Sequence, residues 1–201
     1  MRNFIGFIYQ RSPVVIQNLL LSLYGYQLKK SRYGGRFKNE LIAFKERETF
    51  TSEQWRDYQT IELRKLLAHA FTTVPYYHET YKKHGFNLSD FEKFEIEDLK
   101  KLPYLEKESL RKFGKTTLLS TKRKKGKFLS SSGSTGTPTN IYYTNEFHQT
   151  WFAAYESRVR NWAGVNKQMN RGMIGGQEII HKAEATPPFY RCNYAENQTY
   201  F

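Results

Sequence analysis

The 201 residues include 15 Tyr, 15 Phe and 3 Trp, an aromatic share of 16% that predicts a packed core and excludes an intrinsically disordered chain. Lys and Arg number 32 against 19 Asp and Glu, and the resulting net charge of +13 favours an anionic partner: a nucleotide, a nucleic acid or a lipid surface. A single cysteine, Cys192, excludes a disulfide within the chain and favours a reducing, cytoplasmic compartment.

The first predicted element is a helix within an uncharged, Leu-rich stretch at residues 12–28. It is slightly short for a membrane span, and four polar residues interrupt it: Gln17, Asn18, Ser22 and Gln27. We predict that this helix packs on the body of the protein. The alternative is a helix that lies at a membrane surface, because five cations flank the stretch: Arg2, Arg11, Lys29, Lys30 and Arg32.

Residues 1–50 are expected to form a helical or extended region, which Tyr33-Gly34-Gly35-Arg36-Phe37 interrupts, and residues 51–115 a helical segment. Thr51 followed by Gln54 is a capping-box pattern, so a long helix should begin there and end at Val74-Pro75. Three short helices should follow. We place them at residues 76–84 before Gly85, at 96–101 before Pro103, and at 107–113 before Gly114.

Residues 130–138 (Ser-Ser-Ser-Gly-Ser-Thr-Gly-Thr-Pro) form a hydroxyl-rich loop between two β-favouring segments, 127–129 and 139–143. Hydroxyls donate to phosphate oxygens, and glycines let successive backbone N–H groups point at one anion. Composition alone favours a Ser/Gly linker. The flanking strands and the basic run at 122–127 favour an anion-binding loop, although no Gly-Lys-Ser/Thr ends it as in a Walker A motif.

A further helix is expected from Asn145 to Gly164, with a mostly apolar stripe: Phe147, Trp151, Ala154, Tyr155, Arg158 and Trp162. A strand at 171–174 should follow and turn at Gly175-Gly176. The order of strand, loop, strand, helix and strand predicts α/β architecture for residues 116–201.

The order of residues in the loop is more specific than its composition. It resembles the phosphate loop of adenylate-forming enzymes, whose pattern is Ser/Thr-Ser-Gly-Ser/Thr-Thr-Gly-x-Pro. Every fixed position is met, by Ser131, Ser132, Gly133, Ser134, Thr135, Gly136 and Pro138. Further matching segments lie at 66–70, 74–77, 102–108 and 187–191. Together they make the chain similar to the phenylacetate–coenzyme A ligase-like branch, and within it to the capsular polysaccharide biosynthesis proteins.

The resemblance implies an α/β fold with a helical N-terminal half, followed by the first strands and helix of the enzyme's N-terminal domain. It further implies one incomplete domain overall, in which residues 116–201 begin the nucleotide-binding part. Family enzymes are longer, so the adenine pocket, the ribose-binding acid and the catalytic lysine are expected beyond residue 201. We expect the chain to be the N-terminal part of such an enzyme and to be inactive alone.

The family reaction joins a carboxylate to the α-phosphate of ATP, and the acyl-adenylate then passes its acyl group to an acceptor, often coenzyme A. The resemblance assigns phosphate binding to hydroxyl donors and to two glycines that permit close backbone approach: Ser131, Ser132, Ser134, Thr135 and Thr137, with Gly133 and Gly136. Thr137 stands where many relatives carry Lys, which removes a positive charge.

Mg²⁺ should arrive with ATP and be held mainly by phosphate and water. The five histidines lack paired metal spacing, which argues against a zinc site. Nucleotide and a carboxylate are the expected partners. Basic charge leaves nucleic-acid binding as an alternative, and residues 12–28 leave a peripheral membrane protein as another, although no known nucleic-acid motif is present. The expected location is the cytoplasm, and the alternative is a cytoplasmic protein that contacts the membrane surface through residues 12–28.

Overall fold

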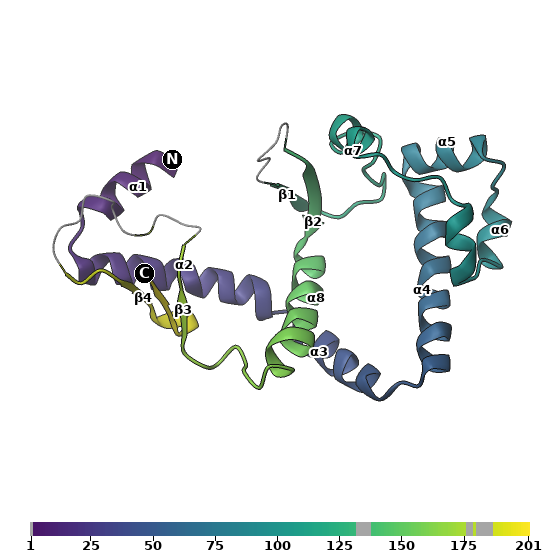
Figure 1. Cartoon of the computed structure of the whole chain (residues 1–201). Helices are drawn as coiled ribbons and strands as arrows, with labels where there is room; N and C mark the ends of the chain where they lie inside the picture. The colour runs from purple at the N-terminus through teal and green to yellow at the C-terminus, as the bar shows by residue number, and fades with distance from the viewer. Residues whose placement is uncertain (1, 132–137, 176–178, 180–186) are drawn as a thin grey trace. The chain divides into compact units, whose positions relative to one another are not determined.

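The computed structural model describes residues 2–131, 138–175, 179 and 187–201. Helices dominate and strands are short, as Figure 1 shows, which agrees with the predicted α/β class. The chain divides into two compact units. We call residues 46–145 the central unit, and residues 1–45 with 146–201 the terminal unit. No helix within the described ranges is long and apolar enough to cross a membrane.

The described residues of the central unit begin with the short 3₁₀ turn η1 (Arg47–Thr49). Helices α4 (Ser52–Thr73), α5 (Pro75–Lys83), α6 (Leu88–Glu92), the 3₁₀ helix η2 (Ile96–Lys101) and α7 (Lys107–Phe113) follow. A β-hairpin of β1 (Gly126–Ser130) and β2 (Asn140–Thr144) completes the unit. The predicted capping box is confirmed, because the Thr51 side chain accepts from the Gln54 N–H and the Gln54 side chain accepts from the Thr51 N–H. The predicted α7 has the expected bounds, and Gly85 has the left-handed φ of +83° expected after α5. The helix at 96–101 is also confirmed, as a 3₁₀ helix.

An aromatic core fixes the helices of the central unit against one another. Phe71 of α4, Tyr81 of α5 and Phe91 of α6 are buried together, with ring centroids 5.4 to 5.6 Å apart for the pairs that include Phe91. Rings in tilted and edge-on arrangements add directional attraction to the burial of apolar area. The buried side chains of this core come from α4, α5 and α6 and from Phe94 after α6, and α6 was not predicted from the sequence.

The terminal unit is built from four helices, a π-helical continuation and a small sheet: α1 (Arg2–Arg11), α2 (Val14–Tyr33), α3 (Phe37–Glu46), α8 (Asn145–Tyr155), η3 (Glu156–Asn161), β3 (Arg171–Met173), β4 (Arg191–Asn193), the turn η4 (Tyr194–Glu196) and β5 (Gln198–Tyr200). The strand order is β3–β5–β4, with β5 parallel to β3 and antiparallel to β4. The chain break predicted after the first Leu-rich helix is confirmed, since α2 ends at Gly34 and Gly35 has a φ of +50°.

Helix α2 packs on β4 and η4 (Figure 1), as predicted for residues 12–28. The contact is made through its polar face. Asn18 Oδ1 accepts the Cys192 N–H at 2.9 Å, and Ser22 Oγ accepts the Tyr194 N–H at 3.0 Å. Gln17 accepts from the Arg191 guanidinium, which is 1% exposed. These bonds satisfy polar groups that would otherwise be costly to bury. We call this contact the polar seam.

The stripe predicted on the helix after Asn145 does not form the buried face of α8. Phe147, Trp151 and Trp162 are exposed, whereas Phe152 and Ala153 are buried. Phe152 packs against Phe37 of α3 and Tyr33 of α2. Helical spacing identified an apolar stripe correctly but not the side on which the partner helices lie. The strand at 171–173 and the turn at Gly175 are confirmed, and Gly176 lies outside the described residues.

Gly25 allows α2 to approach the sheet at the polar seam. A methyl group at this position would come within 2.2 Å of the Asn193 side chain, which is 1% exposed. Gly25→Ala should therefore reduce the free energy of unfolding by about 1–3 kcal/mol, as overpacking does. Gly6→Ala in α1 is the matched control, because no atom lies within 4 Å of that position. Urea unfolding of the two variants checks this, and equal stability for both would contradict it.

Burial in the aromatic core raises the pKa of Tyr81 from 10.0 to about 12, with the nearby Tyr77 adding to the effect. The folded state thus favours the neutral phenol, so this contribution to stability is complete below pH 10 and is lost as the pH rises towards 12. Tyr81→Phe should make the loss of stability between these pH values shallower. Urea unfolding against pH measures it, with exposed Tyr104→Phe as control. If the free energy of unfolding of the Tyr81 variant falls with pH as steeply as that of the wild type, this phenol is not the titrating group.

Candidate functional site

The two strands predicted on either side of the hydroxyl-rich loop are confirmed on the central unit. Strands β1 and β2 pair antiparallel over five positions, from Gly126 opposite Thr144 to Ser130 opposite Asn140. Phe128 and Tyr142 pair across the strands with their ring centroids 5.1 Å apart. Such cross-strand aromatic pairs help to fix the register. The two ends of the hydroxyl-rich loop are therefore held side by side.

Backbone and side-chain bonds continue the pairing one step beyond the strands. The Ser131 N–H donates to the Thr139 oxygen at 2.9 Å, and the Thr139 N–H donates to Ser131 Oγ at 3.0 Å. The Ser130 hydroxyl donates to Asn140 Oδ1 at 2.8 Å. A hydroxyl has one donor and two acceptor positions, so Ser131 can accept from Thr139 and still donate its own proton to another group.

Of the seven residues predicted to bind phosphate, the structure describes Ser131 alone. The other six lie outside the described residues: Ser132, Gly133, Ser134, Thr135, Gly136 and Thr137. Pro138, the last fixed position of the pattern, is described and exposed. The phosphate-binding assignment of these residues therefore remains a prediction, while the hairpin that carries them is an observed feature.

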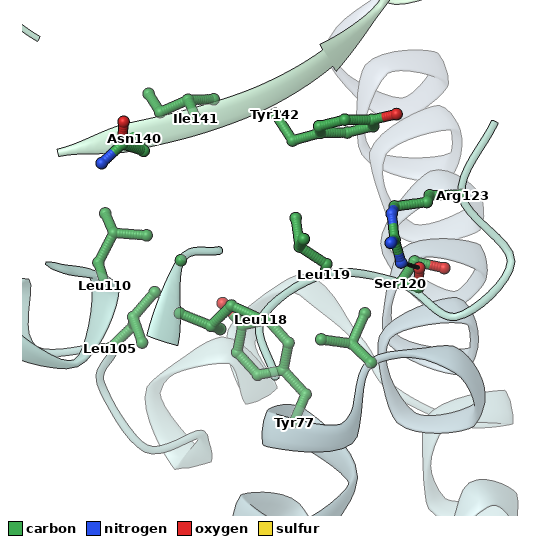
Figure 2. Close-up of a pocket in the computed structure, with 12 residues that line it drawn as sticks. Tyr77, Leu105, Leu110, Leu118, Leu119, Ser120, Arg123, Asn140, Ile141 and Tyr142 are labelled. Atoms are coloured by element: carbon green, nitrogen blue, oxygen red, sulfur yellow. Dashed lines mark hydrogen bonds between the residues drawn. The ribbon is translucent and has the colours of Figure 1, made fainter. Parts of the chain in front are cut away.

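A pocket of about 330 Å³ lies beside the hairpin, within the central unit. In Figure 2, strand β2 passes along one side of it, and Leu105, Leu110, Leu118 and Leu119 lie opposite. Asn140, the first residue of β2, lines the pocket, so the pocket extends to the strand end from which the loop departs. The volume is within the range of small-molecule sites, which are concave and mostly apolar.

Residues 116–121 are held in place by the junction between α4 and α5, and this positions one wall of the pocket. The Tyr76 N–H donates to the Thr117 oxygen at 3.0 Å, and the Thr121 N–H donates to the Thr73 oxygen at 2.7 Å. The Ser120 hydroxyl also donates to Thr73 Oγ1 at 3.0 Å. The wall therefore depends on where α4 ends, which the sequence predicted from Val74-Pro75.

Arg123 and Tyr77 are two of the polar residues that line the pocket. Arg123 donates to the Ser120 oxygen at 3.2 Å, and Figure 2 shows its guanidinium beside Ser120 at the edge of the pocket. Burial, and then the neighbouring Tyr76, raise the pKa of Tyr77, so its phenol stays neutral at physiological pH and remains a hydrogen-bond donor. The apolar walls of the cavity are suited to an apolar part of a ligand, and Arg123 places a positive charge at its edge.

The sequence singled out Arg123 as part of the basic run but did not identify the pocket. Leu118 and Leu119 lie in turns without periodicity, so no pattern marks them as a wall. Leu105 falls within the segment 102–108, which matched the family, and that match was the signal available. Among the described residues, no group of three or more His, Cys, Asp or Glu side chains is placed to hold a metal ion.

Ser131→Ala should weaken the pairing of Ser131 with Thr139 at the two ends of the loop. The change removes the acceptor of the Thr139 N–H, a bond worth about 1 kcal/mol, so the Thr139 amide should exchange with solvent roughly fivefold faster. Ser130→Ala is the matched control, because its hydroxyl bonds a side chain and not this amide. Hydrogen exchange followed by NMR measures both. An unchanged exchange rate of the Thr139 amide in the Ser131 variant would contradict the bond between Thr139 and Ser131.

Known proteins similar to this chain include Protein CapK and several phenylacetate–coenzyme A ligases. The chain is 27% identical over 194 residues to Protein CapK of Staphylococcus aureus, a match that covers 96% of this chain and 41% of that protein. It is 31% identical over 138 residues to the phenylacetate–coenzyme A ligase of Escherichia coli K12, covering 68% of this chain and 29% of the ligase. The Thermus thermophilus ligase of the same name is 32% identical over 100 residues, 49% of this chain and 22% of the ligase.

The chain thus spans less than half the length of each of these relatives. No protein-family model matches it. The match to CapK covers both units, whereas the Thermus ligase matches only about half of the chain. The chain is therefore a homologue of CapK and of the phenylacetate–coenzyme A ligases, which confirms the resemblance of its sequence to that branch of the adenylate-forming enzymes.

Proposed function

We propose that this chain is the phosphate-loop part of an ATP-dependent, AMP-forming carboxylate ligase. In this reaction a carboxylate oxygen attacks the α-phosphorus of ATP, pyrophosphate leaves, and an acyl-adenylate forms. The acyl group then passes to an acceptor, for which coenzyme A is the proposed thiol. The homologous phenylacetate–coenzyme A ligases support both the reaction class and this acceptor.

The observation that carries the proposal is the hydroxyl-rich loop that begins and ends on one closed hairpin. Pairing of Ser131 with Thr139 holds the two ends of this segment together, which supports an anion-binding loop over a tether between domains. Phosphoryl chemistry asks the protein mainly to position the triphosphate and to offset charge as pyrophosphate departs. Backbone N–H groups and hydroxyls serve this purpose without a titratable group.

The roles follow from the residue types. Ser131, Ser132, Ser134, Thr135 and Thr137 donate hydroxyl protons to the β- and γ-phosphates, and Gly133 and Gly136 let backbone N–H groups approach. Mg²⁺ is held mainly by phosphate oxygens and water, as is usual for this ion. The basic run at 122–127 raises the local concentration of the anionic nucleotide.

The biological setting we propose is surface or capsular polysaccharide biosynthesis in the cytoplasm. It rests on the similarity to CapK over 96% of this chain. The carboxylate substrate is not assigned. On its own, the chain is expected to bind nucleotide without turning it over, because it covers at most 41% of these relatives.

Thr135→Val tests the loop directly. The change keeps the shape of the side chain but removes its hydroxyl, and a hydrogen bond to a charged phosphate contributes about 1.5–3 kcal/mol. The affinity for Mg-ATP should therefore fall at least tenfold. Isothermal titration with Mg-ATP measures this affinity for the chain. In a longer homologous enzyme that carries the same change, pyrophosphate exchange measures the loss in adenylate formation.

Thr116→Val is the matched control, because Thr116 is an exposed threonine of the central unit whose hydroxyl bonds the Phe113 oxygen. It should leave nucleotide affinity unchanged. Equal affinity in the Thr135 variant and the wild-type chain, with both folded, would exclude phosphate binding by this hydroxyl. Absence of any Mg-ATP binding by the wild-type chain would count against the whole assignment.

A further inference from the structure

Among the described residues of the terminal unit, the outer face of α2 is apolar and exposed. Five large side chains are exposed: Val15 by 78%, Ile16 by 45%, Leu19 by 57%, Leu23 by 56% and Tyr26 by 63%. At about 100° per residue, these positions fall within one stripe roughly 100° wide. A surface helix of a globular protein normally turns such a stripe towards its core.

The opposite face of α2 is already occupied by the polar seam. Asn18 and Ser22 bond backbone N–H groups of Cys192 and Tyr194, and Gly25 lies against Asn193. A rotation that turned the apolar stripe inward would break these bonds and leave buried polar groups unpaired. The stripe is therefore fixed as an outward surface of this unit.

Basic residues dominate the charge around this surface, although Arg32 is paired with Glu196 and Arg36 with Glu40. Residues 1–39 contain no Asp or Glu, and they carry seven cations: Arg2, Arg11, Lys29, Lys30, Arg32, Arg36 and Lys38. Lys30 follows Tyr26 by one helical turn and is exposed on the same side of α2. On α1, Phe7 and Ile8 are also exposed, and the Arg11 guanidinium lies 4.0 Å from the centroid of the Phe7 ring.

The contrast with α4 of the central unit shows that exposure alone is not the argument. Ile61 and Leu66 of α4 are also exposed, by 50% and 63%. Acidic residues accompany them, since Glu62 lies between the two and pairs with Lys65. That helix combines exposed apolar groups with charges of both signs, which is ordinary for a solvated surface.

We propose that α1 and α2 bind the surface of an anionic phospholipid bilayer. The apolar stripe of α2 enters the boundary between headgroups and acyl chains, with the helix parallel to the membrane, and the cations pair with lipid phosphates. An apolar face combined with clustered Lys and Arg is the established basis of this binding mode. The inference does not depend on the proposed ligase function, because it uses no residue of the hairpin loop.

Vesicle flotation of the full chain tests the inference. The wild-type chain should float with vesicles of 70% phosphatidylcholine and 30% phosphatidylglycerol, and it should float at least tenfold less with phosphatidylcholine alone. Leu19→Ser/Leu23→Ser should reduce flotation with the anionic vesicles at least tenfold, because it removes the centre of the stripe. Ile61→Ser/Leu66→Ser on α4 is the matched control and should float like the wild type.

Two further measurements keep the result decisive. Circular dichroism establishes that both double variants are folded, and sedimentation velocity reports self-association. Flotation that the α2 variant retains, or that does not require anionic lipid, would overturn the inference. A second result would also overturn it: the wild-type chain is an oligomer, the α2 variant is a monomer, and both float equally. The stripe would then be covered by a second copy of the chain. Mg-ATP titration of the α2 variant separates the two proposals, since nucleotide affinity should stay unchanged.

Discussion

The antiparallel pairing of β1 with β2 is the constraint on which the candidate site depends. It brings residues 131 and 139 within hydrogen-bond distance and so fixes the two ends of the proposed phosphate-binding segment. Fixed ends reduce the conformational freedom that a segment has to lose when it binds a ligand. The same pairing places β2 along the apolar pocket, next to the strand end that carries the loop.

Two different kinds of packing stabilise the two units. The central unit depends on an aromatic core shared by α4, α5 and α6, where burial of apolar area is the main term. The terminal unit depends on the polar seam, where Arg191 is 1% exposed and donates to the Pro188 oxygen at 2.8 Å and the Tyr190 oxygen at 2.9 Å. Glu196 is 3% exposed and pairs with Arg32 at 3.1 Å. Removing one member of such a pair is costly, because the partner is left buried with its charge.

Local sequence signals predicted the elements whose boundaries are set locally. The capping box at Thr51, the proline after Val74 and the glycine at position 85 each act within one turn, and the structure has all three. Strands β4 and β5 were missed because three residues each are too few to show alternation. The orientation of α2 was also beyond sequence reasoning, since apolar residues normally face inward and the polar partners come from residues 191–196, far along the chain.

The prediction of the candidate site rests on an ordered pattern rather than a periodicity, and the structure tests only the strands that flank it. The pattern places hydroxyls and glycines at fixed positions, and the flanking residues indicated the two strands that the structure contains. The pocket beside the hairpin could not be predicted. Its walls combine Leu105, Leu118 and Ile141, which only the tertiary fold brings together.

An NMR titration of the isotope-labelled chain with Mg-ATP tests the central claim most directly. The account predicts large shifts of the amide resonances of residues 131–139 and retained cross-strand contacts between 126–130 and 140–144. Saturation should depend on the triphosphate, so AMP should shift these amides far less than Mg-ATP. Shifts confined to other parts of the chain, or loop amides that do not respond to saturating Mg-ATP, would contradict it.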